Sequence, residues 1–229
     1  QPKGLFETLN QRLTKEGDIK LDGISITKED IENITKIVIV ACGTAYYAGL
    51  LGKFAIEKFA GIPVEVDVAS EFRYRDPFVD DKTLFIAISQ SGETLDTLAA
   101  LREAKRKGAR IMSIVNVVGS SVARESDDVF YTWAGPEIAV ASTKAYTTQI
   151  MCLYLVALYM GKISSYISAD EYNSYINALK EIPELLKMTL NCESQICDLA
   201  KELYKEENVF FIGRGTDAST AYEGSLKLK

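Results

Sequence analysis

Short apolar runs rich in β-branched residues alternate with helical patterns through the middle of the chain. The runs lie at 36–41, 64–68, 83–89, 109–115 and 128–132, and the helical patterns lie at 45–59, 69–74, 95–107 and 120–125. Strands that are apolar throughout are typical of parallel sheets covered on both faces. The alternation therefore predicts a doubly wound, flavodoxin-like α/β fold, with five parallel strands and helices on both faces.

A polar turn follows the third of these runs. Residues 89–94 (SQSGET) supply the hydroxyls of Ser89, Ser91 and Thr94 beside the amide of Gln90, immediately before a predicted helix. The start of a helix offers unpaired N–H groups and the positive end of its dipole, which together suit a phosphate dianion. A helix N-cap would account for one hydroxyl but not for three, so the turn predicts a phosphate site.

A second turn, residues 42–44 (CGT), follows the strand predicted at 36–41. Ligands of parallel sheets bind at the carboxyl ends of the strands. We therefore expect Cys42, Gly43 and Thr44 to border the same crevice as the turn at 89–94. No basic residue adjoins Cys42 to lower its pKa, so we interpret it as a small packed residue without a nucleophilic role.

Composition narrows the classes of partner and chemistry. The 229 residues carry a formal charge of -6, which argues against nucleic acid or an anionic membrane as a partner. We find neither a membrane-spanning run nor a signal peptide, and expect a cytoplasmic protein. The four cysteines lack a C-x-x-C spacing and histidine is absent, so we expect no metal site and no cofactor, and any general base must be another side chain.

The flanking segments suggest further helices and a repeat. Apolar spacing predicts a lead-in helix over 3–16, and a helix over 145–160 whose apolar stripe forms core or a subunit interface. Two helices, 169–188 and 192–205, with an interruption at Pro183, are interpreted as a connector. A strand at 208–212, a glycine turn and a helix at 218–229 then repeat the order seen at 36–59. The predicted units are 1–35 (lead-in helix and linker), 36–165 (first domain), 166–207 (connector) and 208–229 (start of a second copy).

Four motifs, taken in order, carry a resemblance to a known family. They are residues 41–44 (ACGT), 89–94 (SQSGET), 134–144 (AGPEIAVASTK), and 213–216 (GRGT) with 223–229 (EGSLKLK). They resemble the sugar isomerase (SIS) domain of glutamine-fructose-6-phosphate aminotransferases, the glucosamine-6-phosphate synthase family. The resemblance spans essentially the whole chain.

The resemblance implies roles for individual residues. Ser89, Gln90, Ser91 and Thr94, with Thr44, would hold the phosphate of fructose 6-phosphate or glucosamine 6-phosphate. The sugar hydroxyls would be contacted by Val140 and Ser142 and by backbone near Cys42 and Gly43. Lys227 matches a lysine that assists proton movement. In the family, ammonia from a separate glutaminase domain aminates fructose 6-phosphate, which is isomerised to glucosamine 6-phosphate, and the enzyme is a homodimer.

Some of the family's parts lie outside these 229 residues. Its catalytic glutamate comes one position after Lys229, and its ring-opening histidine and Schiff-base lysine belong to the remainder of the second copy. The glutaminase domain is also outside the sequence. We therefore expect this fragment to bind the sugar phosphate without turning it over. Ala45 stands where many members have serine, which removes one hydroxyl contact.

Alternatives to this interpretation stay open from the sequence. The same domain occurs in regulators that bind phosphosugars without catalysis, although no basic effector segment is present here. A simple phosphosugar isomerase is disfavoured by the second copy beginning at 208. Taken without the resemblance, Lys227 is a solvated helix position, and Glu137 is either a loop carboxylate or a positioning group.

Overall fold

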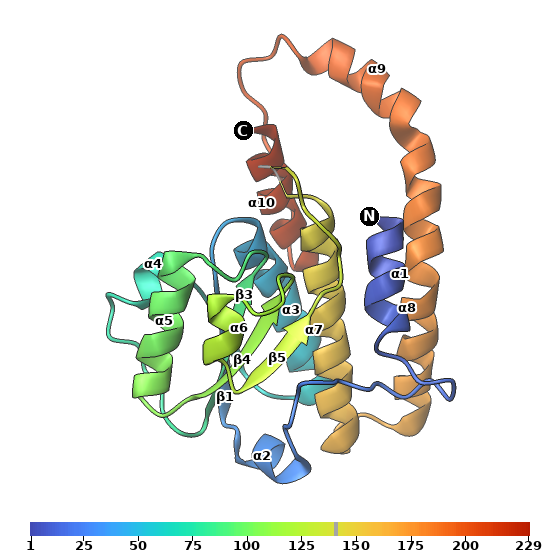
Figure 1. Cartoon of the computed structure of the whole chain (residues 1–229). Coiled ribbons are helices and arrows are strands. Elements are labelled where there is room, and N and C mark those ends of the chain that lie inside the picture. The colour runs from blue at the N-terminus through green and yellow to red at the C-terminus, as the bar shows by residue number, and fades with distance from the viewer. Residues whose placement is uncertain (140–141) are drawn as a thin grey trace.

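Five parallel strands form the centre of this protein, as the computed structural model of residues 1–139 and 142–229 shows (Figure 1). Their order across the sheet is β2-β1-β3-β4-β5, the flavodoxin-like order, which confirms the predicted fold class. The strands are β1 (Lys36–Ala41), β2 (Val64–Val68), β3 (Thr83–Ser89), β4 (Arg110–Val115) and β5 (Asp128–Tyr131).

Helices surround the sheet and extend beyond it. Those of the sheet region are α2 (Lys28–Asn33), α3 (Thr44–Ala60), α4 (Ala69–Phe72), α5 (Leu95–Arg106), α6 (Ser121–Glu125) and α7 (Lys144–Ile163). The remaining ones are α1 (Pro2–Asn10), α8 (Ala169–Thr189), the short 3-10 helix η1 (Leu190–Cys192), α9 (Glu193–Leu203) and α10 (Thr216–Leu228).

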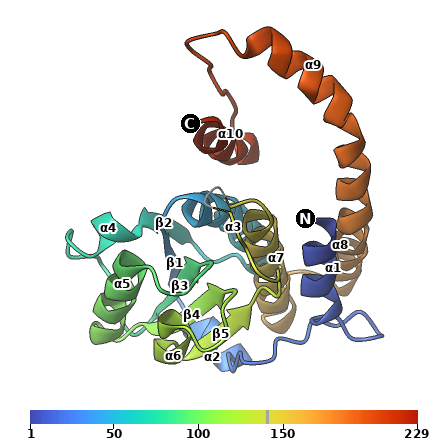
Figure 2. The ribbon, with the colours of Figure 1, turned by 45° about the horizontal axis from the view of Figure 1, so that its top comes forward.

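Both faces of the sheet are buried, because successive side chains of each strand point to opposite sides. On β1, Ile37 and Ile39 join an apolar cluster with α3 and α7, while Val38 and Val40 join a second cluster with α4, α5 and α6. Figure 2 shows these two helical layers on either side of the strands. Helix α7, predicted as core or interface, is core: most of its residues are buried against α3 and the sheet.

The N-terminal segment is fastened to the last strand. Helix α1 packs along α7 and α8; from it Thr8 Oγ1 donates to the carbonyl of Thr132 at 2.6 Å. Just after the helix, Arg12 Nη2 donates to the carbonyl of Tyr131 at 2.9 Å. The predicted helix 3–16 is wrong at its end, since α1 stops at Asn10. Beyond it a turn around Gly17 pairs Leu13 with Ile19 in an isolated bridge.

A buried carboxylate fixes the linker beneath the sheet. Asp128, which is fully buried, accepts from Arg110 Nε at 2.7 Å and from the backbone N–H of Ser25 at 2.6 Å. The Asp128 hydrogen bond and the nearby negative charges raise the pKa of Arg110. Breaking one side of the pair between Arg110 and Asp128 would leave a buried charge without compensation. Because Ser25 bonds to the same carboxylate, this contact also specifies where residues 21–30 lie.

The connector differs from the prediction at one residue. Pro183 lies inside α8, and the helix continues through it to Thr189. The fixed φ of proline is compatible with a helix, and a single lost N–H bond is tolerated where the residue packs, as the buried Pro183 does. Helix α9 then leads away from the sheet as an arch, and no residue of it is buried.

The predicted strand at 208–212 is wrong: these residues form no strand. A strand needs a neighbour for its N–H and C=O groups, and residues 208–212 have no such neighbour in the described part of the chain. Phe210 is 87% exposed and Ile212 is 91% exposed. The turn that follows does repeat the earlier one, because Gly43 (φ 55°, ψ -131°) and Gly215 (φ 59°, ψ -131°) begin α3 and α10 in the same glycine-favouring conformation.

None of the helices in the described ranges, 1–139 and 142–229, combines the length and the apolar character that a membrane crossing requires.

The cysteines should differ strongly in reactivity. Cys152 is buried on α7, and burial raises the pKa of its thiol to about 12, against a smaller opposing effect of Arg12. Because the thiolate is the reactive form, Cys152 should resist a thiol reagent at pH 8 until the protein unfolds. The exposed Cys192 and Cys197 should react first. Peptide mapping after brief labelling checks this; equal labelling of Cys152 and Cys192 in the folded protein would contradict it.

Candidate functional site

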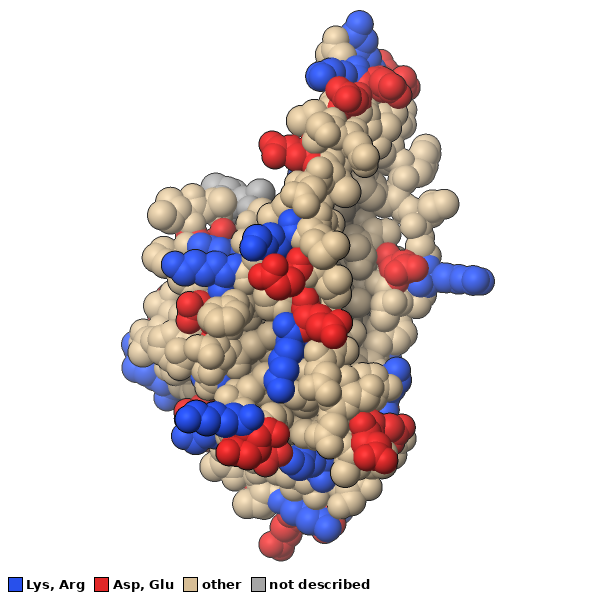
Figure 3. All heavy atoms as spheres, turned by 90° about the vertical axis from the view of Figure 1, so that its right-hand side faces the viewer, with Lys and Arg blue, Asp and Glu red and all other residues tan. Residues whose placement is uncertain are grey.

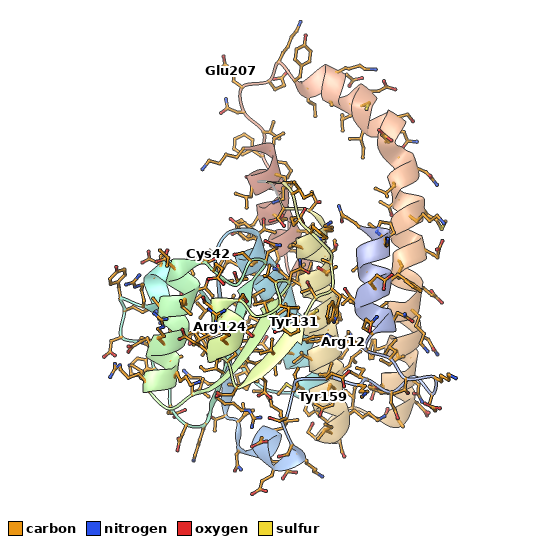
Figure 4. All side chains as sticks on the ribbon, in the orientation of Figure 1. Arg12, Cys42, Arg124, Tyr131, Tyr159 and Glu207 are labelled. Carbon is orange, nitrogen blue, oxygen red and sulfur yellow. The ribbon has the colours of Figure 1, made fainter. Side chains whose placement is uncertain are left out.

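A cleft of about 260 Å³ opens at the carboxyl ends of β1 and β3. Figure 4 shows Cys42 at this edge of the sheet, on the side of the molecule where α10 lies. Both turns singled out in the sequence border this cleft, as the topology of a parallel sheet requires. It is lined by Cys42, Thr44, Ala45, Ile88, Ser89, Gln90, Ser91, Thr94, Thr97, Glu137, Ala139, Ser142 and Gln149.

The turn after β3 is organised by its own hydroxyl groups. Ser89 Oγ accepts from the backbone N–H of Gly92 at 3.0 Å and lies 3.2 Å from Thr94 Oγ1. Ser91 Oγ accepts from the N–H of Glu93 at 3.2 Å. These bonds close a tight loop whose residues Ser89, Ser91 and Thr94 line the cleft, as a phosphate cradle would require.

Gly92 is required for the path of this turn. Its φ of 65° is left-handed, and a Cβ at this position would lie 2.1 Å from Ser120 Oγ. The absence of a side chain lets the turn after β3 approach the start of α6 closely.

The start of α5 faces the cleft without a side-chain cap of its own. Thr94 is the N-cap residue, and its hydroxyl is directed to Ser89 instead of the first turn of the helix. The N–H groups of that turn are therefore available to an anion, which the helix dipole also favours. Asp96 in the same turn is half-buried, and Arg73 Nη1 pairs with it at 3.2 Å.

Two buried polar atoms in the cleft wall lack a partner among the described residues. They are Thr97 Oγ1 and Gln149 Oε1, and both residues are nearly inaccessible. Buried polar groups are normally hydrogen-bonded, because an unmade bond costs about 1–3 kcal/mol. Unpaired polar atoms in the lining of a cleft are what a site for a polar ligand requires.

The opposite wall comes from the segment before α7. Glu137 Oε2 accepts from the N–H of Ala145 at 3.1 Å and from Ser142 Oγ at 3.4 Å. The carboxylate left open in the sequence analysis thus holds the start of α7 and positions Ser142 in the cleft. Val140, the other predicted sugar contact, lies outside the described residues.

Helix α10 reaches the same region from the far end of the sequence. Lys227 Nζ donates to Thr44 Oγ1 at 2.7 Å and pairs with Glu223 Oε1 at 2.8 Å. Glu223, only 6% exposed, also accepts from Thr44 Oγ1 at 3.3 Å. Lys227 is therefore an ordered neighbour of the cleft residue Thr44.

Burial, with a smaller effect of Glu223, raises the pKa of the nearby Tyr146 to about 12, so that this phenol stays protonated.

The structure brings together most of the predicted site residues. Those in the cleft lining are Cys42, Thr44, Ser89, Gln90, Ser91, Thr94 and Ser142. Gly43 lies between two of them, and Lys227 bonds to Thr44. Sequence reasoning missed Thr97 and Gln149. Thr97 lies one turn beyond Thr94 on a helix, and Gln149 is a polar residue within an apolar helix, so both carried a signal.

The cleft lining carries little charge. No lysine or arginine lines the cleft in the part of the chain that the structure describes. The face in Figure 3 carries basic and acidic side chains intermixed.

Within residues 1–139 and 142–229, no three His, Cys, Asp or Glu side chains are grouped closely enough to hold a metal ion.

Comparison with known proteins agrees with the fold. The model of the SIS domain family matches residues 30–159, which contain the five strands and every residue of the cleft.

Relatives match the chain along its full length. It is 58% identical over 229 residues to a glutamine--fructose-6-phosphate aminotransferase [isomerizing] of Caldanaerobacter subterraneus, and 55% identical to one of Clostridium tetani. These residues span 38% of the length of each relative.

Solved structures give the same result for the fold. The C-terminal domain of glucosamine-fructose-6-phosphate aminotransferase from Francisella tularensis superposes with a TM-score of 0.93 at 42% identity, covering all of this chain and 64% of that one. A glucosamine-6-phosphate deaminase from Thermotoga maritima, 18% identical, shares the fold with a TM-score of 0.69. The chain therefore belongs to the SIS domain family, and the proteins it resembles along its whole length are glutamine-fructose-6-phosphate aminotransferases.

Proposed function

We propose that this chain is the phosphosugar-binding part of a glutamine-fructose-6-phosphate aminotransferase. The cleft at the ends of β1 and β3 binds the phosphate of fructose 6-phosphate or glucosamine 6-phosphate. In the longer protein, the sugar is aminated with ammonia from glutamine and isomerised to glucosamine 6-phosphate.

The observation that carries the proposal is the meeting of two kinds of donor, side-chain hydroxyls and backbone N–H groups, in one cleft. Ser91, Thr94 and Thr97 line this cleft together with the uncapped start of α5, and Thr97 Oγ1 has no partner among the described residues. A phosphate accepts several hydrogen bonds at once, and fixed N–H dipoles can hold it without a formal positive charge.

The other residues have roles on the sugar in this proposal. Ser142, Val140 and backbone near Cys42 and Gly43 contact the hydroxyls, while Thr44 lies between the phosphate site and α10. Lys227 moves a proton near the first two carbons. Its contact with Thr44 supports this role, because a lysine held at 2.7 Å from a cleft residue needs little reorganisation to reach a ligand.

The remainder of the polypeptide is part of the proposal as well. We infer that residues 208–229 begin a second SIS copy, supported by the matching conformations of Gly43 and Gly215. A glutaminase domain would supply the ammonia, and a second copy of the protein would complete a homodimer. The four free cysteines fit a reducing compartment, so we include a cytoplasmic location.

Binding should depend on both the phosphate and the turn. In calorimetric titrations the chain should bind glucosamine 6-phosphate, inorganic phosphate more weakly, and glucosamine not measurably. Ser91→Ala and Thr94→Val should each weaken glucosamine 6-phosphate binding about tenfold or more, since a hydrogen bond to a charged group contributes about 1.5–3 kcal/mol.

The matched control for these variants is Ser126→Ala, which removes a hydroxyl bonded to the Val122 carbonyl at the end of α6, away from the cleft. Its affinity should equal that of the wild type. Binding of glucosamine as tight as that of its phosphate, or equal affinity in Thr94→Val, would disprove the cradle.

The pair between Glu223 and Lys227 should be visible in stability. Lys227→Met leaves the nearly buried Glu223 carboxylate without its cation and should lower the free energy of unfolding by about 1–3 kcal/mol. Adding Glu223→Gln should recover much of this loss, because the uncompensated charge is gone. Denaturant titration of the two single variants and the double variant measures the coupling, and strictly additive losses would mean that the two side chains do not interact.

A further inference from the structure

Trp133, the only tryptophan of the chain, occupies an unusual backbone conformation just after β5. Its φ is 54°, in the left-handed region that bulky side chains avoid, and its side chain is 45% exposed. The indole packs against the ring of Tyr131, with ring centroids 5.9 Å apart. Strained backbone persists only where surrounding contacts determine it, and such positions cluster near functional sites.

The side chain of Asn116, just after β4, bonds to the hydroxyl of Thr132 before Trp133 and to the backbone after it. Asn116 Oδ1 accepts from Thr132 Oγ1 and from the N–H of Ala134, each at 2.9 Å. Asn116 Nδ2 donates to the carbonyl of Gly135 at 2.8 Å. One amide thus binds three residues, Thr132, Ala134 and Gly135, of the segment that leads to Glu137.

The backbone of Asn116 holds the other wall of the cleft. Its N–H donates to the carbonyl of Gln90, inside the turn at 89–94, at 3.1 Å. One residue therefore touches the phosphate cradle with its main chain and the opposite wall with its side chain.

The strand end beneath this contact is fixed independently. The N–H of Thr132 donates to the carbonyl of Val115 at 2.9 Å, and α1 contributes the bond from Thr8 Oγ1 to the Thr132 carbonyl. Figure 4 shows the neighbouring Tyr131 at this end of the sheet. The part of the wall that these bonds do not fix therefore begins after Thr132, where the Asn116 amide bonds to Ala134 and Gly135.

We propose that Asn116 is a positioning residue that sets the separation between the phosphate cradle and the wall carrying Glu137 and Ser142. It acts by holding Trp133 in the left-handed conformation that turns the chain into that wall. The proposal deepens the phosphosugar assignment and rests on it for its ligand. Asn116 itself does not line the cleft.

The test compares ligands that use one wall or both. Asn116→Ala removes the three side-chain bonds but keeps the backbone bond to Gln90. Its affinity for glucosamine 6-phosphate should fall about tenfold, while its affinity for inorganic phosphate stays within about twofold of the wild type. Asn116→Asp keeps the acceptor Oδ1 but replaces the Nδ2 donor with an oxygen that faces the Gly135 carbonyl, so it should also lose affinity for glucosamine 6-phosphate. The exposed Asn173→Ala on α8 is the matched control.

Rescue separates positioning from general destabilisation. Glycine adopts a positive φ without strain, so in a Trp133→Gly background Asn116→Ala should weaken glucosamine 6-phosphate binding by less than in the parent chain. If Asn116→Ala loses affinity for both ligands equally, and its Tm falls in parallel, Asn116 is a stabilising residue only and the proposal is overturned.

The single tryptophan supplies a readout that needs no ligand. Acrylamide should quench Trp133 fluorescence more strongly in Asn116→Ala than in the wild type, because the turn is released. If the wild type does not bind glucosamine 6-phosphate, the proposed function fails, and quenching alone decides whether Asn116 holds the turn. If the wild type binds glucosamine 6-phosphate, and Asn116→Ala binds both ligands with the affinities of the wild type, the proposed function stands and the role of Asn116 is rejected.

Discussion

Burial of both faces of a parallel sheet is the constraint on which the rest of this protein depends. Parallel strands must be joined by crossovers, so each strand is followed by a loop at the same edge and each face acquires helices. The carboxyl ends of β1, β3, β4 and β5 consequently meet. The turns at 42–44 and 89–94, Asn116 and the segment after Thr132 become neighbours for this reason, although up to 90 residues separate them along the chain.

The cleft at this edge is built from neutral donors in an acidic protein. The formal charge is -6, and the lining holds hydroxyls, amides and the start of α5, together with one carboxylate, Glu137. That carboxylate is occupied by the N–H of Ala145 and by Ser142. The site can therefore favour a phosphate through oriented dipoles at short range, while the overall charge disfavours polyanions such as nucleic acid. This combination suits a small metabolite.

The distant helix α10 brings a lysine close to a cleft whose described lining has no cation. It stacks Tyr222 on Tyr47 of α3, with ring centroids 5.9 Å apart, and brings Glu223 and Lys227 to Thr44. The pair is held by i,i+4 spacing on one helix and by a threonine from another. Helix α10 is thus linked to α3 through contacts at Thr44, although residues 208–212 before it are exposed.

The sequence by itself determined the five strands, the helices between them and the two turns, because apolar periodicity and turn chemistry are local properties. It also contained the motifs that match the SIS family. Only the tertiary structure decided that residues 208–212 form no strand, that α8 continues through Pro183 and that Asn116 contacts both walls. Whether a strand is paired, how a proline packs and which groups an amide side chain can bond all depend on what lies nearby in space. Thr97 and Gln149 became site residues for the same reason: their unpartnered atoms are meaningful only once burial is known.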